Sequence, residues 1–130
     1  MDALKILCEE FGQIAGTELD LTRGPARLDI GHFGPWWIEA DPSHQILTIH
    51  HEVDDAHTGD CAHWLEVNSQ FPLLAGAWLA YHRPSDRIRL CALVEVTQSS
   101  GQLLINFLNN LQYVRANLPA PRTRYFSSPL

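Results

Sequence analysis

The spacing of apolar residues changes along this chain, and that change constrains the fold more than any other feature. Between residues 19 and 53, apolar and polar residues alternate in short runs, which is typical of half-buried strands. Breaker clusters containing glycine or proline separate the runs at residues 23–25, 31–35 and 40–44. The pattern predicts two or three short antiparallel strands joined by tight turns. The alternating apolar residues are Leu19 and Leu21, Leu28 and Ile30, Trp36 and Ile38, and Leu47, Ile49 and Val53.

Two further alternating runs predict a hairpin in the second half of the chain. They flank residues 82–86, where proline, serine and aspartate are typical of a turn. The apolar positions are Ala77, Leu79 and Tyr81 before the turn, and Ile88, Leu90, Ala92, Val94 and Val96 after it.

Segments with helical spacing of apolar residues precede, separate and follow these strands. Apolar residues recur every three or four positions over residues 2–15, 60–71 and 99–118, which predicts three amphipathic helices. The expected boundary residues are Asp2 and Gly16 for the first helix, Pro72 for the end of the second, and the capping-box pair Ser99 and Gln102 for the third.

These elements predict an α+β fold: an antiparallel five-stranded sheet with three helices, in the order α-β-β-β-α-β-β-α. At 130 residues the chain is long enough for one core. We expect a single domain over residues 1–118, followed by a flexible, proline-rich tail over residues 119–130.

One face of such a sheet is expected to lack full cover. The outward positions of the last strand are mixed in polarity, and Trp78 points outward on its neighbour. These outward positions are Arg87, Arg89, Cys91, Leu93 and Glu95. An exposed tryptophan, cysteine and leucine on adjacent strands indicate a second subunit or a bound segment over them, the alternative being cover by the chain's own tail.

Charge excludes several classes of partner. The net charge is −6, and no Lys or Arg occurs between Arg27 and Arg83. Such a chain repels nucleic acid and anionic membranes, whereas apolar residues among the acids leave a polypeptide partner possible. The N-terminus lacks a secretory pattern and no apolar run could span a bilayer, so we expect a cytoplasmic protein. The three cysteines are odd in number and far apart, and are expected to be buried thiols.

Catalytic and cofactor motifs are missing from the sequence. It contains no phosphate-binding glycine loop and no nucleophile elbow, and we predict no enzyme activity and no cofactor. Residues 50–63 hold every side-chain type that binds zinc, but His51, His57 and His63 are spaced six apart, unlike the short paired spacings of structural zinc sites. We therefore predict no metal site and interpret this segment as a polar loop before a helix.

Several short stretches are similar to those of one protein family. They are LKILCEEFG at residues 4–12, LDI at 28–30, WIE at 37–39, WLEVN at 64–68 and the hairpin at 76–96. Together with the element order and the acidic balance, they resemble the class I chaperones of bacterial type III secretion, the Tir-chaperone family. The resemblance covers roughly residues 3–118. The Phe71-Pro72 junction departs from the usual longer second helix.

The resemblance implies a homodimer or paired heterodimer that acts without ATP. Such a dimer binds the N-terminal region of a secreted effector or regulator and keeps it soluble and extended. In the family the second helix and last hairpin build the dimer interface, and the matching positions here are Trp64, Leu65, Trp78, Cys91 and Leu93.

We predict the client-binding surface on the first helix and first three strands. The candidate partner-binding residues are Phe11, Phe33, Trp36, Trp37 and Ile38. Because side chains alternate along a strand, at least one of the two adjacent tryptophans should lie outside the core. Two hypotheses compete with a chaperone: a regulatory domain of the same fold that binds a folded partner, and a small metal-dependent enzyme that uses residues 50–63.

Overall fold

Five antiparallel strands form one sheet in a computed structural model that describes residues 2–53 and 56–121. The strand order is β1-β2-β3-β5-β4, so β1 and β4 are the edges. The strands are β1 (Ala26–Leu28), β2 (Trp36–Ala40), β3 (Ile46–Glu52), β4 (Trp78–His82) and β5 (Arg87–Glu95). The helices are α1 (Ala3–Ala15), α2 (Cys61–Val67), α3 (Phe71–Leu74) and α4 (Gly101–Ala116), with short 3-10 turns η1 (Thr58–Asp60) and η2 (Val96–Gln98). The predicted fold class and element order are confirmed, with α3 as an additional short helix.

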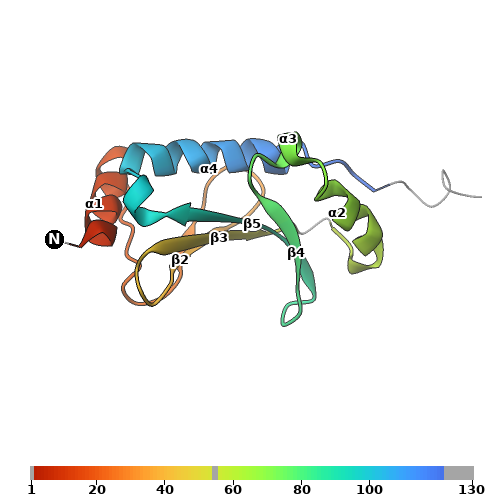
Figure 1. Cartoon of the computed structure of the whole chain (residues 1–130), viewed down its shortest axis with the longest axis horizontal. Coiled ribbons are helices and arrows are strands. Elements are labelled where there is room, and N and C mark those ends of the chain that lie inside the picture. The colour runs from red at the N-terminus through yellow and green to blue at the C-terminus, as the bar shows by residue number, and fades with distance from the viewer. Residues whose placement is uncertain (1, 54–55, 122–130) are drawn as a thin grey trace, which may run out of the picture.

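Helices α1 and α4 lie together over one face of the sheet, and α2 stands beside β4 at the end of the molecule (Figure 1). The core lies between these two layers. Alternate residues of the central strands point into it, together with the apolar stripes of both long helices. Its most buried members include Trp36, Ile38, Leu47, Ile49, Leu90 and Ala92 from the sheet, and Leu7, Phe11, Leu104 and Leu111 from the helices.

The boundaries of α1 are those that the sequence predicts. Asp2 is the N-cap, and its carboxylate accepts a hydrogen bond from the Leu4 N–H at 3.0 Å. Gly16 ends the helix in the left-handed conformation at φ 71°, and its N–H donates to the Gly12 carbonyl.

The prediction that Leu19 and Leu21 lie on a strand is wrong. Both residues belong to the irregular segment between α1 and β1, yet both are buried in the core. Their alternation reflects a segment that lies on the core with every second side chain inward, without a neighbouring strand to pair with.

The predicted single helix over residues 60–71 is also wrong in its extent. Helix α2 ends at Val67, and Phe71 and Pro72 open α3 instead of closing a longer helix. Proline fits the first turn of a helix, where its missing N–H would have no partner in any case. Helix α3 brings Leu74 into the core.

The cap of α4 is one residue later than predicted. Ser100, not Ser99, is the N-cap, and its hydroxyl oxygen accepts from the Leu103 N–H at 3.2 Å. This places Gly101 at the first position of α4, directly against α1. A Cβ built on Gly101 would lie 2.6 Å from the backbone of Glu10 and Phe11. The absence of a side chain at this position therefore sets how closely the two helices approach.

We expect Gly101→Ala to destabilise the protein by about 2 kcal/mol, because the added methyl group meets backbone that cannot move aside without separating α1 from α4. Urea unfolding followed by circular dichroism measures the change. Gly59→Ala is the matched control, since nothing lies within 4 Å of a Cβ there. Equal stabilities of the two variants would contradict this account of the helix contact.

Candidate partner-binding surfaces

The face of the sheet opposite the helices carries a row of side chains that crosses all five strands. The strand register aligns Arg27, Trp37, His50, Cys91 and Trp78 from one edge to the other. Residues in register on one face of a sheet lie side by side. We call this surface the open face.

The open face is apolar in part and only partly shielded from solvent. Leu93 is 53% exposed and Trp78 37% exposed, whereas Cys91 and Trp37 are half-buried. Residues one position along each strand point the other way and are buried, for example Leu90 and Ala92. The predicted exposure is confirmed for Trp78 and Leu93, whereas Cys91, predicted to be exposed with them, is half-buried.

Two nitrogen atoms on the open face are shielded from solvent but lack a hydrogen-bond partner in the described part of the chain. His50 Nδ1 and Arg89 Nε are buried and have no hydrogen-bond partner among residues 2–53 and 56–121. Burial, and then the charge of Arg89, lowers the pKa of His50, although Glu39 Oε1 lies 3.7 Å from its Nε2 and opposes the shift. The lowered pKa favours neutral His50 at pH 7, so this side chain adds no positive charge beside Arg89.

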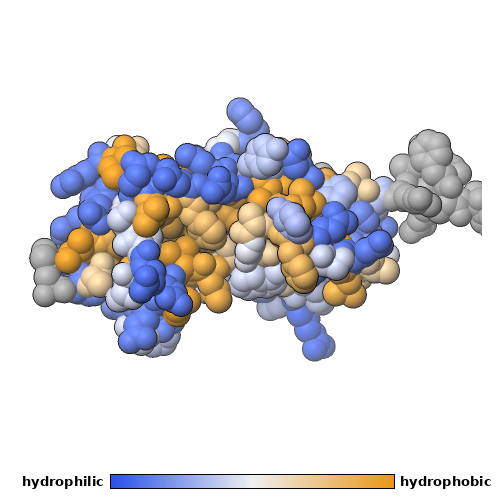
Figure 2. Space-filling view, turned by 45° about the horizontal axis from the view of Figure 1, so that its top comes forward, coloured by the Kyte–Doolittle hydropathy of each residue, from blue (hydrophilic) through white to orange (hydrophobic). Residues whose placement is uncertain are grey.

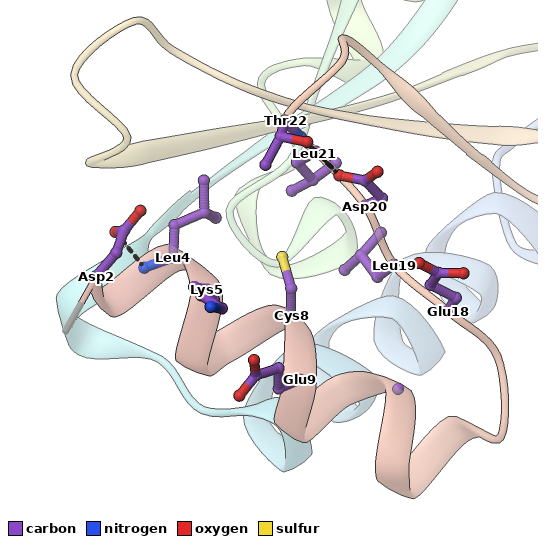
Figure 3. A pocket seen from close by; sticks show the side chains of 11 residues that line it. Asp2, Leu4, Lys5, Cys8, Glu9, Glu18, Leu19, Asp20, Leu21 and Thr22 are labelled. Atoms are coloured by element: carbon purple, nitrogen blue, oxygen red, sulfur yellow. Dashed lines mark hydrogen bonds between the residues drawn. The ribbon is translucent and has the colours of Figure 1, made fainter.

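A groove lies between α1 and residues 18–22 (Figure 3). Its volume is about 360 Å³. Leu4, Leu19 and Leu21 form an apolar floor, and the Cys8 thiol points between them. We call this site the α1 groove.

A second, smaller groove lies between α2 and the edge strand β4. It has a volume of about 130 Å³ and is lined almost entirely by apolar atoms. Trp64 and Leu79 lie at its base, while Leu65 is 70% exposed and Tyr81 50% exposed at its margin. Apolar side chains also interrupt the charged surface on the helix side of the molecule (Figure 2).

The five candidate partner-binding residues do not share one surface. Phe11, Trp36 and Ile38 are at most 3% exposed and belong to the core. Trp37 is half-buried on the open face, so the alternation argument correctly placed one tryptophan outside the core. Phe33 is half-buried at a different place, against Arg115.

A buried polar cluster holds Phe33 and Trp36 in these positions. Arg115 Nε donates to His51 Nε2 at 3.2 Å, and its guanidinium lies 4.4 Å from the centre of the Phe33 ring. The His51 ring stacks on Trp36, and its Nδ1 donates to the Pro35 carbonyl at 2.9 Å. With one nitrogen donating and the other accepting, His51 is neutral. The sequence contained a signal for its burial, because His51 continues the inward positions of Leu47 and Ile49.

Residues 7–118 match the model of the Tir chaperone protein (CesT) family. The chain belongs to the Tir chaperone family. The resemblance noted in the sequence is thereby confirmed. No curated protein matches the chain by sequence.

Solved structures with the same fold include three complexes. A chain of the HopA1–SchA chaperone–effector complex has a TM-score of 0.69 at 17% identity, over 88% of this chain and 91% of that one. The Yersinia pestis type III secretion chaperone SycH in complex with a fragment of YscM2 gives 0.67 at 20% identity, over 91% and 100%. The heterodimeric ExoU–SpcU complex from the type III secretion system of Pseudomonas aeruginosa gives 0.62 at 19% identity, over 85% and 92%.

The residues matched to the family's dimer interface fall on two sides of β4. Trp78, Cys91 and Leu93 lie on the open face, and Leu65 lies on α2. Trp64 is 5% exposed and supports α2 from within the core.

The histidine-rich segment is spread over several environments. His50 and His51 point to opposite faces of β3, and His63 Nε2 lies 2.7 Å from the Pro119 carbonyl. Asp54 and Asp55 lie outside the described residues. Within the described part of the chain, no group of three or more His, Cys, Asp or Glu residues could hold a metal ion. Cys8, Cys61 and Cys91 form no disulfide, as predicted, but they are half-buried instead of fully buried. No helix among the described residues is long and apolar enough to cross a membrane.

The lowered pKa of His50 predicts a pH dependence of stability. In the unfolded chain the pKa of this histidine is about 6.5. Below that pH the unfolded state binds more protons than the folded state, so the free energy of unfolding decreases. The protein therefore keeps its full stability above the unfolded pKa of His50 and loses part of it as pH falls through the folded pKa. We expect the wild type to lose more stability than His50→Gln between pH 7.5 and pH 5 in urea unfolding. His57→Gln, at an exposed position, should keep the wild-type pH dependence. If the stability of this control also changed less with pH than that of the wild type, the assignment to His50 would be contradicted.

Proposed function

We propose that this protein is an ATP-independent chaperone of type III secretion. It binds the N-terminal segment of a secreted effector or secretion regulator in the bacterial cytoplasm, and it keeps that segment soluble and extended. Its role is binding, not catalysis. The observation that carries the proposal is an open sheet face, together with apolar grooves, in a chain of the Tir chaperone family. The similar structures described above include a chaperone–effector complex and a secretion chaperone bound to a protein fragment.

The sheet also offers backbone hydrogen-bonding groups to an extended segment. Strands β1 and β4 are the edges of the sheet. At β4 the Asn68 side chain already bonds the Leu79 N–H and carbonyl, so β1 is the edge whose backbone groups are better placed to pair with a further strand. A client segment can add as a strand at such an edge, while its alternate side chains enter an adjacent apolar hollow. Binding of this kind needs neither a folded client nor ATP.

We also propose that the protein acts as a dimer through the surfaces on both sides of β4. The open face presents Trp78, Cys91 and Leu93, and α2 presents Leu65. A large exposed tryptophan and leucine in the same region are typical of an interface. The net charge of −6 keeps the assembled complex in solution.

The test of the proposed function is purification of the tagged chain from its native host, with identification of the copurifying protein. We expect a secreted protein bound through its N-terminal region. A folded partner that is not secreted would instead support a regulatory domain and contradict the chaperone.

Trp37 is expected to contribute to client binding. We predict that Trp37→Ala weakens the affinity for the client's N-terminal region by about 2 kcal/mol, as loss of an aromatic anchor does. Calorimetry measures the affinity, and circular dichroism confirms that the fold is kept. Tyr113→Ala, at an exposed aromatic position on α4, is the control and should bind as the wild type does. Equal affinity of both variants would remove Trp37 from the binding surface.

The dimer is tested by light scattering. We expect twice the chain mass of 14.7 kDa at micromolar concentration, and a shift toward the monomer in Leu65→Asp combined with Trp78→Asp. The substitutions place carboxylates in a contact that would otherwise be desolvated. Tyr113→Asp changes the charge of an exposed aromatic position elsewhere and should remain dimeric. A monomeric wild type at every concentration would refute the dimer.

A further inference from the structure

The α1 groove combines an apolar floor with a strongly acidic rim. Four carboxylates surround it, from Asp2, Glu9, Glu18 and Asp20, against the single ammonium group of Lys5. They come from both walls of the groove and lie around its perimeter, not together at one point (Figure 3). This arrangement spreads negative charge over the whole mouth instead of forming a cation site.

Two of the acids have structural roles, and two are unpaired. Asp2 caps α1, and Asp20 accepts from both the Thr22 N–H and its hydroxyl, which lowers the Asp20 pKa. Glu9 and Glu18 are exposed, and in the described part of the chain neither has a hydrogen-bond or ion-pair partner. These two side chains are therefore available to a ligand.

The negative charges of the rim also act on the floor of the α1 groove. Burial raises the pKa of the Cys8 thiol, and the charges of Asp20, Asp2 and Glu9 each raise it further. The thiol consequently stays neutral, and the floor remains apolar beneath a negative rim. A ligand that fits must present apolar atoms inward and positive charge at the margin.

We propose that the α1 groove binds an extended partner segment in which apolar side chains alternate with arginine or lysine. This inference rests on the proposed function and specifies the client chemistry that the groove selects. The cavity of about 360 Å³ accommodates a few aliphatic side chains, not a folded domain. A second copy of this chain is disfavoured as the occupant, because a self-contact of this surface would bring two acidic rims together.

The experiment uses synthetic peptides and the full-length protein. One fluorescein-labelled 16-residue peptide alternates leucine with arginine, and its partner peptide alternates leucine with glutamate. We expect the arginine peptide to bind at least tenfold more tightly in about 50 mM salt, with the preference narrowing in about 500 mM salt as the rim charges are screened. Amide NMR shifts on binding should concentrate in α1 and residues 18–22.

Charge-reversal variants locate the site. Glu9→Lys combined with Glu18→Lys should weaken binding of the arginine peptide at least tenfold, with circular dichroism unchanged because neither residue supports the fold. Glu66→Lys combined with Asp29→Lys makes the same change in net charge at exposed positions elsewhere and should bind as the wild type does. Equal losses in the two double variants, or shifts centred outside α1 and residues 18–22, would overturn the proposal.

The peptide-binding experiment and the copurification experiment can fail independently of each other. A chain that copurifies with a secreted client but does not prefer the arginine peptide refutes the groove inference and leaves the chaperone in place. A chain that binds the arginine peptide in the α1 groove but copurifies with no secreted client supports the groove and contradicts the chaperone.

Discussion

The one-sided cover of the sheet is the constraint on which the rest of the structure depends. With α1 and α4 on a single face, every second residue of each strand points into the core and the others point toward solvent. The described part of the chain buries only one of the two resulting surfaces. The helix layer is in turn fixed by the close approach at Gly101, since any wider spacing would open the core above Leu7 and Leu104. The open face is thus a consequence of how the core is built.

Much of this architecture was predictable because each long element has a local periodicity that survives folding. The period of α1, its cap at Asp2 and its stop at Gly16 depend only on residues close in sequence. Errors arose where a pattern has two physical origins. Leu19 and Leu21 alternate like a strand but lie on the core as a loop, and the Phe71-Pro72 pair fits the start of a helix as well as its end.

The candidate site was predictable only in part. To predict which side chains are buried, one must know which face of each strand the helices cover, and the sequence pattern alone does not show this. Alternation placed Trp36 and Trp37 on opposite faces without showing which face the helices would cover. Phe33 was grouped with them as apolar, whereas it packs on Arg115 from the far end of the chain. The α1 groove was missed entirely: its acids are spread between residues 2 and 20, and only the path of residues 18–22 past α1 brings them together.

The positions of the two proposed binding surfaces indicate whether the client is extended or folded. The α1 groove belongs to the helix layer, and the open face lies on the other side of the sheet. They also differ in chemistry, since the rim of the groove is acidic while neutral His50 lies at the centre of the open face. A globular partner can contact one side of a domain of this size. An extended segment can pass around the edge strand β1 and reach both the α1 groove and the Trp37 end of the open face, which leaves Trp78, Cys91 and Leu93 to the dimer. Such a path buries apolar side chains at two separated places, and the chain between them need not fold. The geometry therefore favours a client that stays extended over one that docks as a folded unit.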